Sequence, residues 1–455
     1  MPAPSDLVHE TSTTTGTGNF TLTNANGKRS FNTAFGNGAP TDVFDYFISN
    51  RDAAEWERGT GHLSAASTLV RDTVKASSNA GAAVNFSAGT KDVTNDIPAA
   101  RQVYTDESGN IANSIASINS GPLSGVRNRL INGFMRIWQV QNTGAAAATD
   151  GVYSFDGWYH LNQTAGVTVS RLSDVENTTP SMMRVTQANA AAQRFGIAQV
   201  IEGKDCRYLR GQAVTLSARV RCSNSTTLRY AILEWTSTED SVTKDCVNDW
   251  TSATYTAGNF FLAANYTITG TGSIALTANT LTNITALTVT LGSSLNNVVV
   301  FFWTDSTQAQ NSTLDFGKIQ LEAGSSATVF ERLPLDTEVA RCERFYWKTY
   351  DLDTAPGSVT FQGALGGPAT QSDRLKSTFM FRNRLRGIPT ITIYDPDGTG
   401  AANKCRDDGN VQITVTTPTF DGAAETGFRN IRDAGGTPFT ANAGYNTHVV
   451  ADARL

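Results

Sequence analysis

The feature that most constrains this chain is a series of short β-type runs separated by turns rich in Asn, Gly, Ser and Thr. Runs of this length and spacing are typical of a two-sheet β-sandwich or jelly roll. Within residues 213–219, Val214, Leu216 and Ala218 alternate with polar side chains, which is the period-2 pattern of a half-buried strand. Residues 298–303 are apolar at every position and predict a strand that is covered on both faces. In the central region the runs lie at 167–172, 193–201, 214–221, 229–235, 260–269, 284–291, 298–303 and 314–321.

The sequence on either side of this region predicts further β-structure. Residues 1–100 combine a Thr-rich start with aromatic strand material, and residues 55–61 predict a strand that ends at a Gly turn. After residue 347, strand-like runs return at 359–363, 378–382, 390–394, 411–415 and 448–451. We therefore expect an all-β chain of tandem β-sandwich or jelly-roll domains at 1–100, 126–335 and 336–455. Because polar segments join them, few core contacts should cross the boundaries.

Two short helices are expected between these domains. In the polar connector 101–125, Ile111, Ile115 and Ile118 have a helical spacing. So narrow an apolar stripe cannot be buried by its own helix, so it packs either on its own domain or against two other copies of the chain on an axis. The second helix is predicted before the C-terminal domain at 336–347, capped by Asp336 or Thr337.

Charge and cysteine content exclude several classes of protein. The formal net charge is -5 and no large Lys/Arg cluster is present, which argues against a nucleic-acid partner. The longest apolar run is too short to span a bilayer, so no membrane insertion is expected. The five cysteines are widely spaced and odd in number, which indicates reduced, buried thiols from folding in a cytosol. The N-terminus lacks the basic start and apolar core of a signal peptide.

No motif predicts catalysis, a metal site or a cofactor. The four histidines form neither H-E-x-x-H nor a Cys/His cluster, and no G-x-S-x-G elbow occurs. Glu322 and Glu331 flank a turn and could pair as in a glycosidase, but a structural role is favoured. Asp395 begins a run like a calcium loop, yet Arg406 occupies the position where an EF-hand needs Glu, and a Pro-Asp-Gly turn explains the run better.

The candidate ligand-binding residues are aromatic. Sugar recognition needs flat ring faces, together with side chains that hydrogen-bond to hydroxyls. In the central domain, Trp235 and Trp250 bracket a polar segment, and Tyr255 and Tyr159 complete the candidate set. The Gly-, Asn- and Asp-rich loops at 350–375 and 395–445 are a second place for recognition, since loops on a rigid scaffold often bind ligands.

Several segments together resemble proteins of bacteriophage tail fibres and tail tips. In the central region they are N-R-L-I-N-G-x-x-x-I-W-Q at 128–139, F-D-G-W-Y at 155–159, Q-V-I-E at 199–202, L-R-G-Q-A-V-T-L-S at 209–217 and I-Q-L-E-A-G-x-x-A-T-x-F-E-R at 319–332. The first and last look like the first and last strands of one domain. Gly157 stands where the family normally has Arg. Residues 71–93 resemble the N-terminal domain that attaches such fibres to the tail.

The resemblance implies a structural and adhesive subunit, a tail fibre with a carbohydrate-binding-module-like jelly roll. Its partners would be other phage tail or baseplate proteins, two further copies in a homotrimer, and a host surface polysaccharide or other receptor. It would be made and folded in the host bacterial cytoplasm and would act in the virion tail, without a cofactor. Two alternatives stay open: a depolymerising tailspike enzyme, although no stacked short repeat is visible, and a purely structural baseplate protein.

Overall fold

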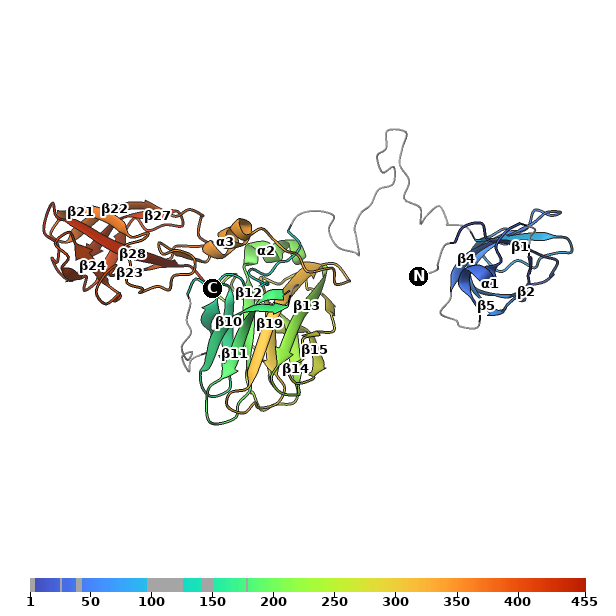
Figure 1. Ribbon diagram of the computed structural model, residues 1–455, viewed down its shortest axis with the longest axis horizontal. Coiled ribbons are helices and arrows are strands. Elements are labelled where there is room, and N and C mark those ends of the chain that lie inside the picture. The colour runs from blue at the N-terminus through green and yellow to red at the C-terminus, as the bar shows by residue number, and fades with distance from the viewer. Residues whose placement is uncertain (1–4, 25–26, 38–42, 96–125, 141–149, 177–178) are drawn as a thin grey trace, which may run out of the picture. The chain divides into compact units, whose positions relative to one another are not determined.

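The computed structural model describes residues 5–24, 27–37, 43–95, 126–140, 150–176 and 179–455 (Figure 1). The chain divides into two compact units, Met1–Ile115 and Ala116–Leu455. Every ladder between the strands named below is antiparallel, so the predicted all-β class is confirmed. The predicted connector at 101–125, with its isoleucine stripe, lies outside the described residues.

The first unit is built on one sheet in the order β2-β6-β5-β4-β7-β1-β3. Phe20, Phe44 and Ile48 are fully buried in its core. The predicted turn at Gly59 and Gly61 is wrong, because β5 continues through both glycines. A Cβ at Gly59 would lie 2.7 Å from the Tyr46 hydroxyl. The two glycines therefore leave space for the Tyr46 ring within a continuous strand and do not form a turn. Its elements are β1 (His9–Ser12), β2 (Phe20–Thr21), β3 (Thr23–Asn24), α1 (Phe31–Phe35), β4 (Phe44–Asn50), β5 (Trp56–Ala65), β6 (Thr68–Ser77) and β7 (Lys91–Thr94).

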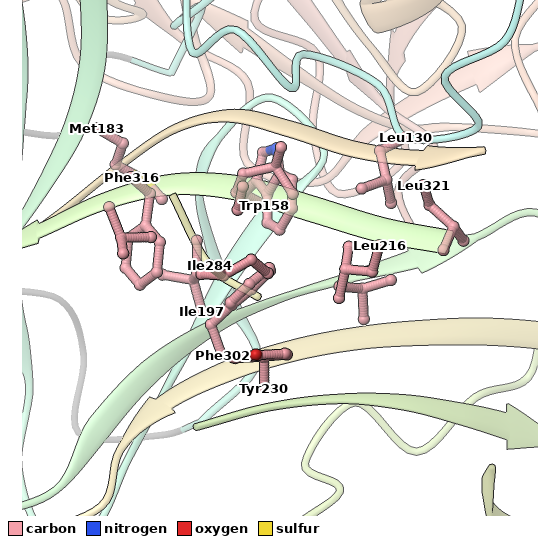
Figure 2. Packing of buried hydrophobic residues seen from close by; sticks show 14 of the residues in the cluster. Leu130, Trp158, Met183, Ile197, Leu216, Tyr230, Ile284, Phe302, Phe316 and Leu321 are labelled. Carbon is pink, nitrogen blue, oxygen red and sulfur yellow. The ribbon is translucent and has the colours of Figure 1, made fainter. Parts of the chain in front are cut away.

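The central part of the second unit is a two-sheet sandwich. One sheet has the order β10-β11-β19-β13-β16, with β17 also on β13, and the other has the order β15-β14-β18-β12-β9-β8. Side chains from both sheets, including Leu216, Phe302 and Phe316, meet between the layers (Figure 2). The elements are β8 (Val152–Phe155), β9 (Trp158–Asn162), β10 (Val167–Glu176), β11 (Thr179–Gln187), β12 (Phe195–Ile201), α2 (Gly203–Cys206), η2 (Arg207–Leu209), β13 (Ala213–Cys222), β14 (Thr226–Trp235), β15 (Tyr266–Leu276), β16 (Thr282–Asn283), β17 (Leu287–Thr290), β18 (Asn297–Thr304) and β19 (Thr313–Ala323).

Strand β18 is buried on both faces, as its unbroken apolar run predicts. Val300 and Phe302 point into the core between the sheets. Phe301 and Trp303 point to the opposite face, into a second apolar layer that includes Cys246 and Phe260 from the segment before β15. Because that segment covers the sheet from outside, every residue of β18 is removed from water. The expected runs at 260–269 and 284–291 are strands only in part.

The opening and closing segments of the central domain lie side by side, but the opening segment is not a strand. The Asn128 side-chain amide donates to the Ile319 carbonyl (2.9 Å), and the Arg129 amide donates to the Leu321 carbonyl (2.8 Å). Residues 128–139 are irregular because Asn132 and Met135 have φ angles of 51° and 55°. Beyond Asn132 the segment contacts β19 again, where the Ile319 amide donates to the Gly133 carbonyl at 2.9 Å.

The C-terminal part is organised around β28. Residues of its second half pair with β20 on one side and β23 on the other, whereas the first half pairs with β21 and β24. The expected strand at 359–363 is irregular, with Val359 and Phe361 exposed. The elements are α3 (Leu335–Glu343), β20 (Tyr346–Lys348), β21 (Leu365–Gln371), β22 (Arg374–Met380), β23 (Thr390–Tyr394), β24 (Lys404–Asp407), β25 (Gln412–Thr414), β26 (Pro418–Asp421), β27 (Gly427–Asp433) and β28 (Gly444–Asp452).

The expected helix before this part is present as α3, but its predicted cap is wrong. Pro334 is the N-cap, without a side-chain hydrogen bond, and Asp336 lies in the first turn. The helix ends at Glu343, so Tyr346 belongs to the following strand. Pro334 fits the cap position because it fixes φ near the value that the chain needs to enter the helix.

The buried apolar clusters of the central sandwich and of the C-terminal part share no residue, but polar bonds cross residue 335. The Glu338 carboxylate accepts a hydrogen bond from the Asn132 amide, and Arg344 forms an ion pair with the buried Glu202 at 2.7 Å. Lys348 donates to the Gln139 carbonyl at 2.8 Å, which places a buried ammonium on the opening segment. Polar groups buried without partners are costly, so these bonds couple α3 and β20 to the central sandwich.

Candidate functional site

Two of the four predicted aromatic residues are buried. Tyr159 is fully buried, and its hydroxyl donates to the Lys244 carbonyl at 3.1 Å. Trp235 is 4% exposed and donates from Nε1 to the Thr238 carbonyl at 2.9 Å. Both belong to the apolar layer on the outer face of the β18 sheet. Neither ring therefore has a face open to a ligand.

The other two aromatic residues keep part of their surface exposed at the rim of the same layer. Trp250 contacts Phe260 and Phe301 edge-on. Tyr255 lies under the Arg229 guanidinium, 3.8 Å from carbon to ring centre, and its hydroxyl donates to the Asp305 carboxylate. The structure thus gathers the four predicted residues in one layer, where they hold the segment before β15. A ligand role for Trp250 and Tyr255 stays a prediction.

A pocket of about 360 Å³ lies on the opposite side of the sandwich, on the outer face of the β13–β19 sheet. Its floor includes Ser217 and Arg219 of β13 and Lys318 of β19. Asn283, from β16, contributes an amide on one side. The lining is completed by Ala218, Ile284, Ala286, Ala327, Thr328, Val329, Phe330 and Arg332. The pocket size lies within the range of ligand sites, about 300–1,000 Å³.

A β-bulge in β19 shapes this floor. Ser217 pairs with Gln320, but Arg219 pairs with Gly317, so β19 carries one extra residue between these pairs. Lys318 has a φ of 49°, a left-handed conformation that costs a non-Gly residue about 1–2 kcal/mol. A bulge redirects side chains and is common beside functional sites. Lys318 therefore occupies a backbone position that Gly would adopt with less strain, and its side chain lines the pocket.

The wall above the bulge comes from the closing segment after β19. Phe330 stacks on Phe134 with ring centres 5.4 Å apart, and the Arg332 guanidinium lies 5.5 Å from the Phe134 ring centre. Val329 is 85% exposed at the pocket edge. The opening segment thus supports the closing segment through an aromatic pair, and one half-buried ring of that pair lines the pocket.

The two glutamates weighed as a catalytic pair both fix this closing segment. The Glu322 carboxylate accepts from the Thr328 amide at 2.7 Å and from Gln320 Nε2 at 2.9 Å. The Glu331 carboxylate accepts from the amides of Arg127 and Asn128, each at 2.8 Å. The positions of the two carboxylates define the loop that carries Phe330.

Beside the pocket, an ion-pair network continues along the same face. Asp315 is 1% exposed and accepts from Arg184 Nε and from Arg221 Nε, each at 2.8 Å. Hydrogen bonding to Asp315 raises the pKa of the Arg184 guanidinium. The network joins β11, β19 and β13. Its ion pairs therefore support the register of these three strands next to the pocket floor.

The sequence contains a signal for this site that the strand assignment alone does not use. Core side chains in β19 fall at Leu314, Phe316, Ile319 and Leu321, so the spacing changes from two to three and back to two. A strand with period-2 alternation can keep all four in the core only if a residue is inserted between Phe316 and Ile319. Gly and Lys at the insertion predict a bulge.

The structure adds three facts about other kinds of site. Within the described ranges, no three His, Cys, Asp or Glu side chains gather closely enough to hold a metal ion. No helix in that part of the chain is both long and apolar enough to cross a bilayer. The five cysteines are free and buried, and burial raises the pKa of Cys206 and of Cys405 to about 12.

Comparison with known proteins gives similarity to solved structures alone. No family model matches the sequence, and no curated protein matches it. A family 61 carbohydrate-binding module in complex with β-1,4-galactotriose is 9% identical, over 44% of this chain and 99% of that chain, with a TM-score of 0.26. The enzymatically active domain of tailspike protein 4 from bacteriophage CBA120 is 11% identical, over 43% of this chain and 21% of that chain, with a TM-score of 0.26.

A third similar structure is the CBM22-1 xylan-binding domain of Paenibacillus barcinonensis Xyn10C. It is 10% identical, over 41% of this chain and 96% of that chain, with a TM-score of 0.24. At such identities and TM-scores, we take nothing about ligand or activity from the three similarities. They are three of the solved structures to which the chain is similar.

Proposed function

We propose that this chain is an adhesive and structural subunit of a bacteriophage tail fibre that binds a saccharide of the host cell surface. The observation that carries the saccharide part is the pocket on the β13–β19 sheet. Its lining combines the Ser217 hydroxyl, the Asn283 amide and three cationic side chains with the ring of Phe330. Hydroxyl-rich ligands are bound by such donors and acceptors around an apolar face.

The rigidity of the site supports recognition of a ligand at low entropic cost. The floor lies on two paired strands, and the carboxylates of Glu322 and Glu331 fix the wall. A preformed site loses little conformational freedom when a ligand binds. The bulge at Lys318 gives the same support, since a strained residue persists where the surrounding structure over-determines it.

The tail-fibre part of the proposal is supported by the order of the resembling segments along the chain. According to this proposal, the unit that contains residues 71–93 attaches to other tail or baseplate proteins, and three copies of the chain form the fibre. The protein acts in the virion without catalysis. Mass measurement in solution should then give about three chains per particle, and a monomer that still joins tails would contradict the trimer.

The binding test compares full-length variants on immobilised polysaccharide from cells that the phage infects. Lys318→Ala and Asn283→Ala should each weaken retention about tenfold, because each removes a polar contact in the pocket. Lys204→Ala is the matched control, since that lysine lies in α2 with its side chain 61% exposed and is not part of the pocket lining. Unchanged retention by both pocket variants would overturn the assignment of the site.

The same polysaccharide tests the enzymatic alternative. After incubation with the purified protein, its size distribution by gel filtration should be unchanged. Release of defined oligosaccharides would favour the depolymerising tailspike. Absence of any binding by the wild-type protein, together with normal incorporation into tails, would favour the purely structural baseplate protein.

A further inference from the structure

A second hollow, of about 560 Å³, lies where the C-terminal part meets β8 and the segment before β15. Tyr153 and Lys244 line it from the central domain. Tyr394, Asp452 and Arg454 line it from the C-terminal part, with Tyr346, Thr390 and Thr392. The lining therefore combines three aromatic rings, hydroxyl groups and two cations beside one carboxylate.

The two walls of this hollow are held together by direct bonds. The Tyr153 hydroxyl donates to the Leu455 carbonyl at 2.8 Å. Arg386 donates from Nε to the Ala453 carbonyl at 2.9 Å and forms an ion pair with Asp240 at 3.4 Å. Since both walls belong to one compact unit, the hollow is preformed and does not depend on a ligand to assemble.

Arg454 is fixed in the wall with part of its hydrogen-bonding capacity unused. Its Nε and Nη2 donate to the Asp452 carboxylate at 2.9 and 2.5 Å. Its guanidinium carbon lies 4.8 Å from the Tyr153 ring centre and 4.6 Å from that of Tyr346. Among the described residues, its buried Nη1 has no hydrogen-bond partner. Because Nη1 is buried, an acceptor in the hollow would meet the positive charge of the guanidinium and not this N–H group.

Lys244 supplies the other cation. Its stem lies across Gly151, where a Cβ would come within 3.1 Å of the lysine Cβ, and its ammonium lies 5.0 Å from the Tyr153 ring centre. No hydrogen bond or ion pair joins this ammonium to another described residue. Burial, and then the charge of Arg454, lowers the pKa of Lys244. An added anion would oppose both effects, because an opposite charge favours the protonated ammonium.

We propose that this hollow binds a carboxylate-bearing sugar, such as a uronic acid unit of a polysaccharide. The carboxylate accepts from the Lys244 ammonium, and the Arg454 guanidinium behind it adds the second positive charge. Charge-assisted bonds of this kind are stronger than neutral ones. The tyrosine rings and threonine hydroxyls suit a sugar ring and its hydroxyls, which favours a sugar acid over a simple inorganic anion.

This inference deepens the proposed saccharide binding and adds a second subsite, at a distance in the fold from the Lys318 pocket. It can fail while the first site stands, because the two hollows share no lining residue. A neutral saccharide bound through the Lys318 pocket, with no preference for acidic sugars, would leave the proposed function intact and remove this subsite.

The test measures binding of polygalacturonate, alginate and hyaluronate to the full-length protein by affinity electrophoresis. Carboxyl-reduced forms of the same polymers serve as ligand controls. We expect at least one acidic polymer to bind and its reduced form to bind at least tenfold more weakly. Lys244→Gln should lose about the same factor, Lys244→Arg should restore part of it, and Lys204→Gln should bind as the wild type does.

Thermal unfolding of each variant separates loss of binding from loss of the fold. Lys244→Gln should unfold at or slightly above the wild-type temperature, because it removes a partly buried cation with no hydrogen-bond partner among the described residues. The inference is overturned if none of the three polymers binds, if carboxyl reduction leaves binding unchanged, or if Lys244→Gln binds as tightly as Lys204→Gln.

Discussion

At Lys318, the usual order of Ala and Gly in a β-strand should be reversed. In an ordinary strand, Gly is less stable than Ala by about 0.5–1 kcal/mol, because the unfolded chain gains more freedom with Gly. At position 318, φ is 49°, and this left-handed conformation costs Ala about 1–2 kcal/mol and Gly almost nothing. The difference predicts that Lys318→Gly is more stable than Lys318→Ala by about 0.5–1 kcal/mol.

The comparison between the two variants isolates the backbone, because both remove the lysine side chain and whatever it contacts. Urea unfolding should be followed by tryptophan fluorescence, since the described tryptophans lie mainly in the second unit. Ser273 in β15 provides a matched control, because it is exposed and lies in a strand without a positive φ. There, Ala should be more stable than Gly by about 0.5–1 kcal/mol.

The binding assay completes this prediction. Both Lys318 variants should lose the same affinity for polysaccharide, although one is more stable than the other. Stability would then increase from Ala to Gly without recovery of binding, as expected where a strained residue is kept for function. If Lys318→Ala proved as stable as Lys318→Gly, the residue would not be strained in solution, and the argument from the bulge would fail.

Three further predictions concern the stability of the second unit. Burial lowers the pKa of His160 from 6.5 to about 4. The unfolded chain therefore binds a proton on this residue more readily than the folded chain does, and about 3 kcal/mol of stability should be lost as pH falls from 6.5 to 4. Urea titrations across that range should show this loss in the wild type but not in His160→Gln. Gly157→Arg should lower the free energy of unfolding by about 2–4 kcal/mol in the same measurement, because φ is 79° and a Cβ would lie 2.5 Å from Ile131 Cγ1. Adding Ile131→Ala should recover part of this loss. Phe302→Ala should cost about 3–5 kcal/mol, since the ring is fully buried between the sheets. Thr290→Ala at an exposed strand position should change stability by less than about 0.5 kcal/mol.

The backbone conformation and close packing at Gly157 explain why this chain differs there from the family that it resembles. The family's Arg stands at a position that here forms the tight turn between β8 and β9. Ile131 of the opening segment occupies the space that any larger side chain would need. The sequence shows the substitution, but the reason for it depends on a residue 26 positions earlier, which the fold brings against the turn.

The local alternation of apolar and polar residues was enough to predict the strands in which one face is consistently more apolar than the other, or both faces are apolar. The alternation at Val214, Leu216 and Ala218 assigns one face of β13 to the core, and the structure buries all three. The unbroken apolar run in β18 required cover on both sides, which the structure provides. Period-2 geometry fixes such assignments, since successive side chains of a strand point to opposite faces whatever the rest of the chain does.

Tertiary structure decided which polar and aromatic residues face a ligand. Trp235 and Tyr159 carry the ring faces that sugar binding needs, yet the segment before β15 covers them. Lys244 and Arg454 lie 210 positions apart in the sequence, and they share a hollow because the C-terminal part packs against β8. Alternation shows that a face is polar or apolar, but it cannot show which distant segment lies against that face. That choice depends on the summed packing of the whole unit, so the two sites proposed here could be located only in the folded chain.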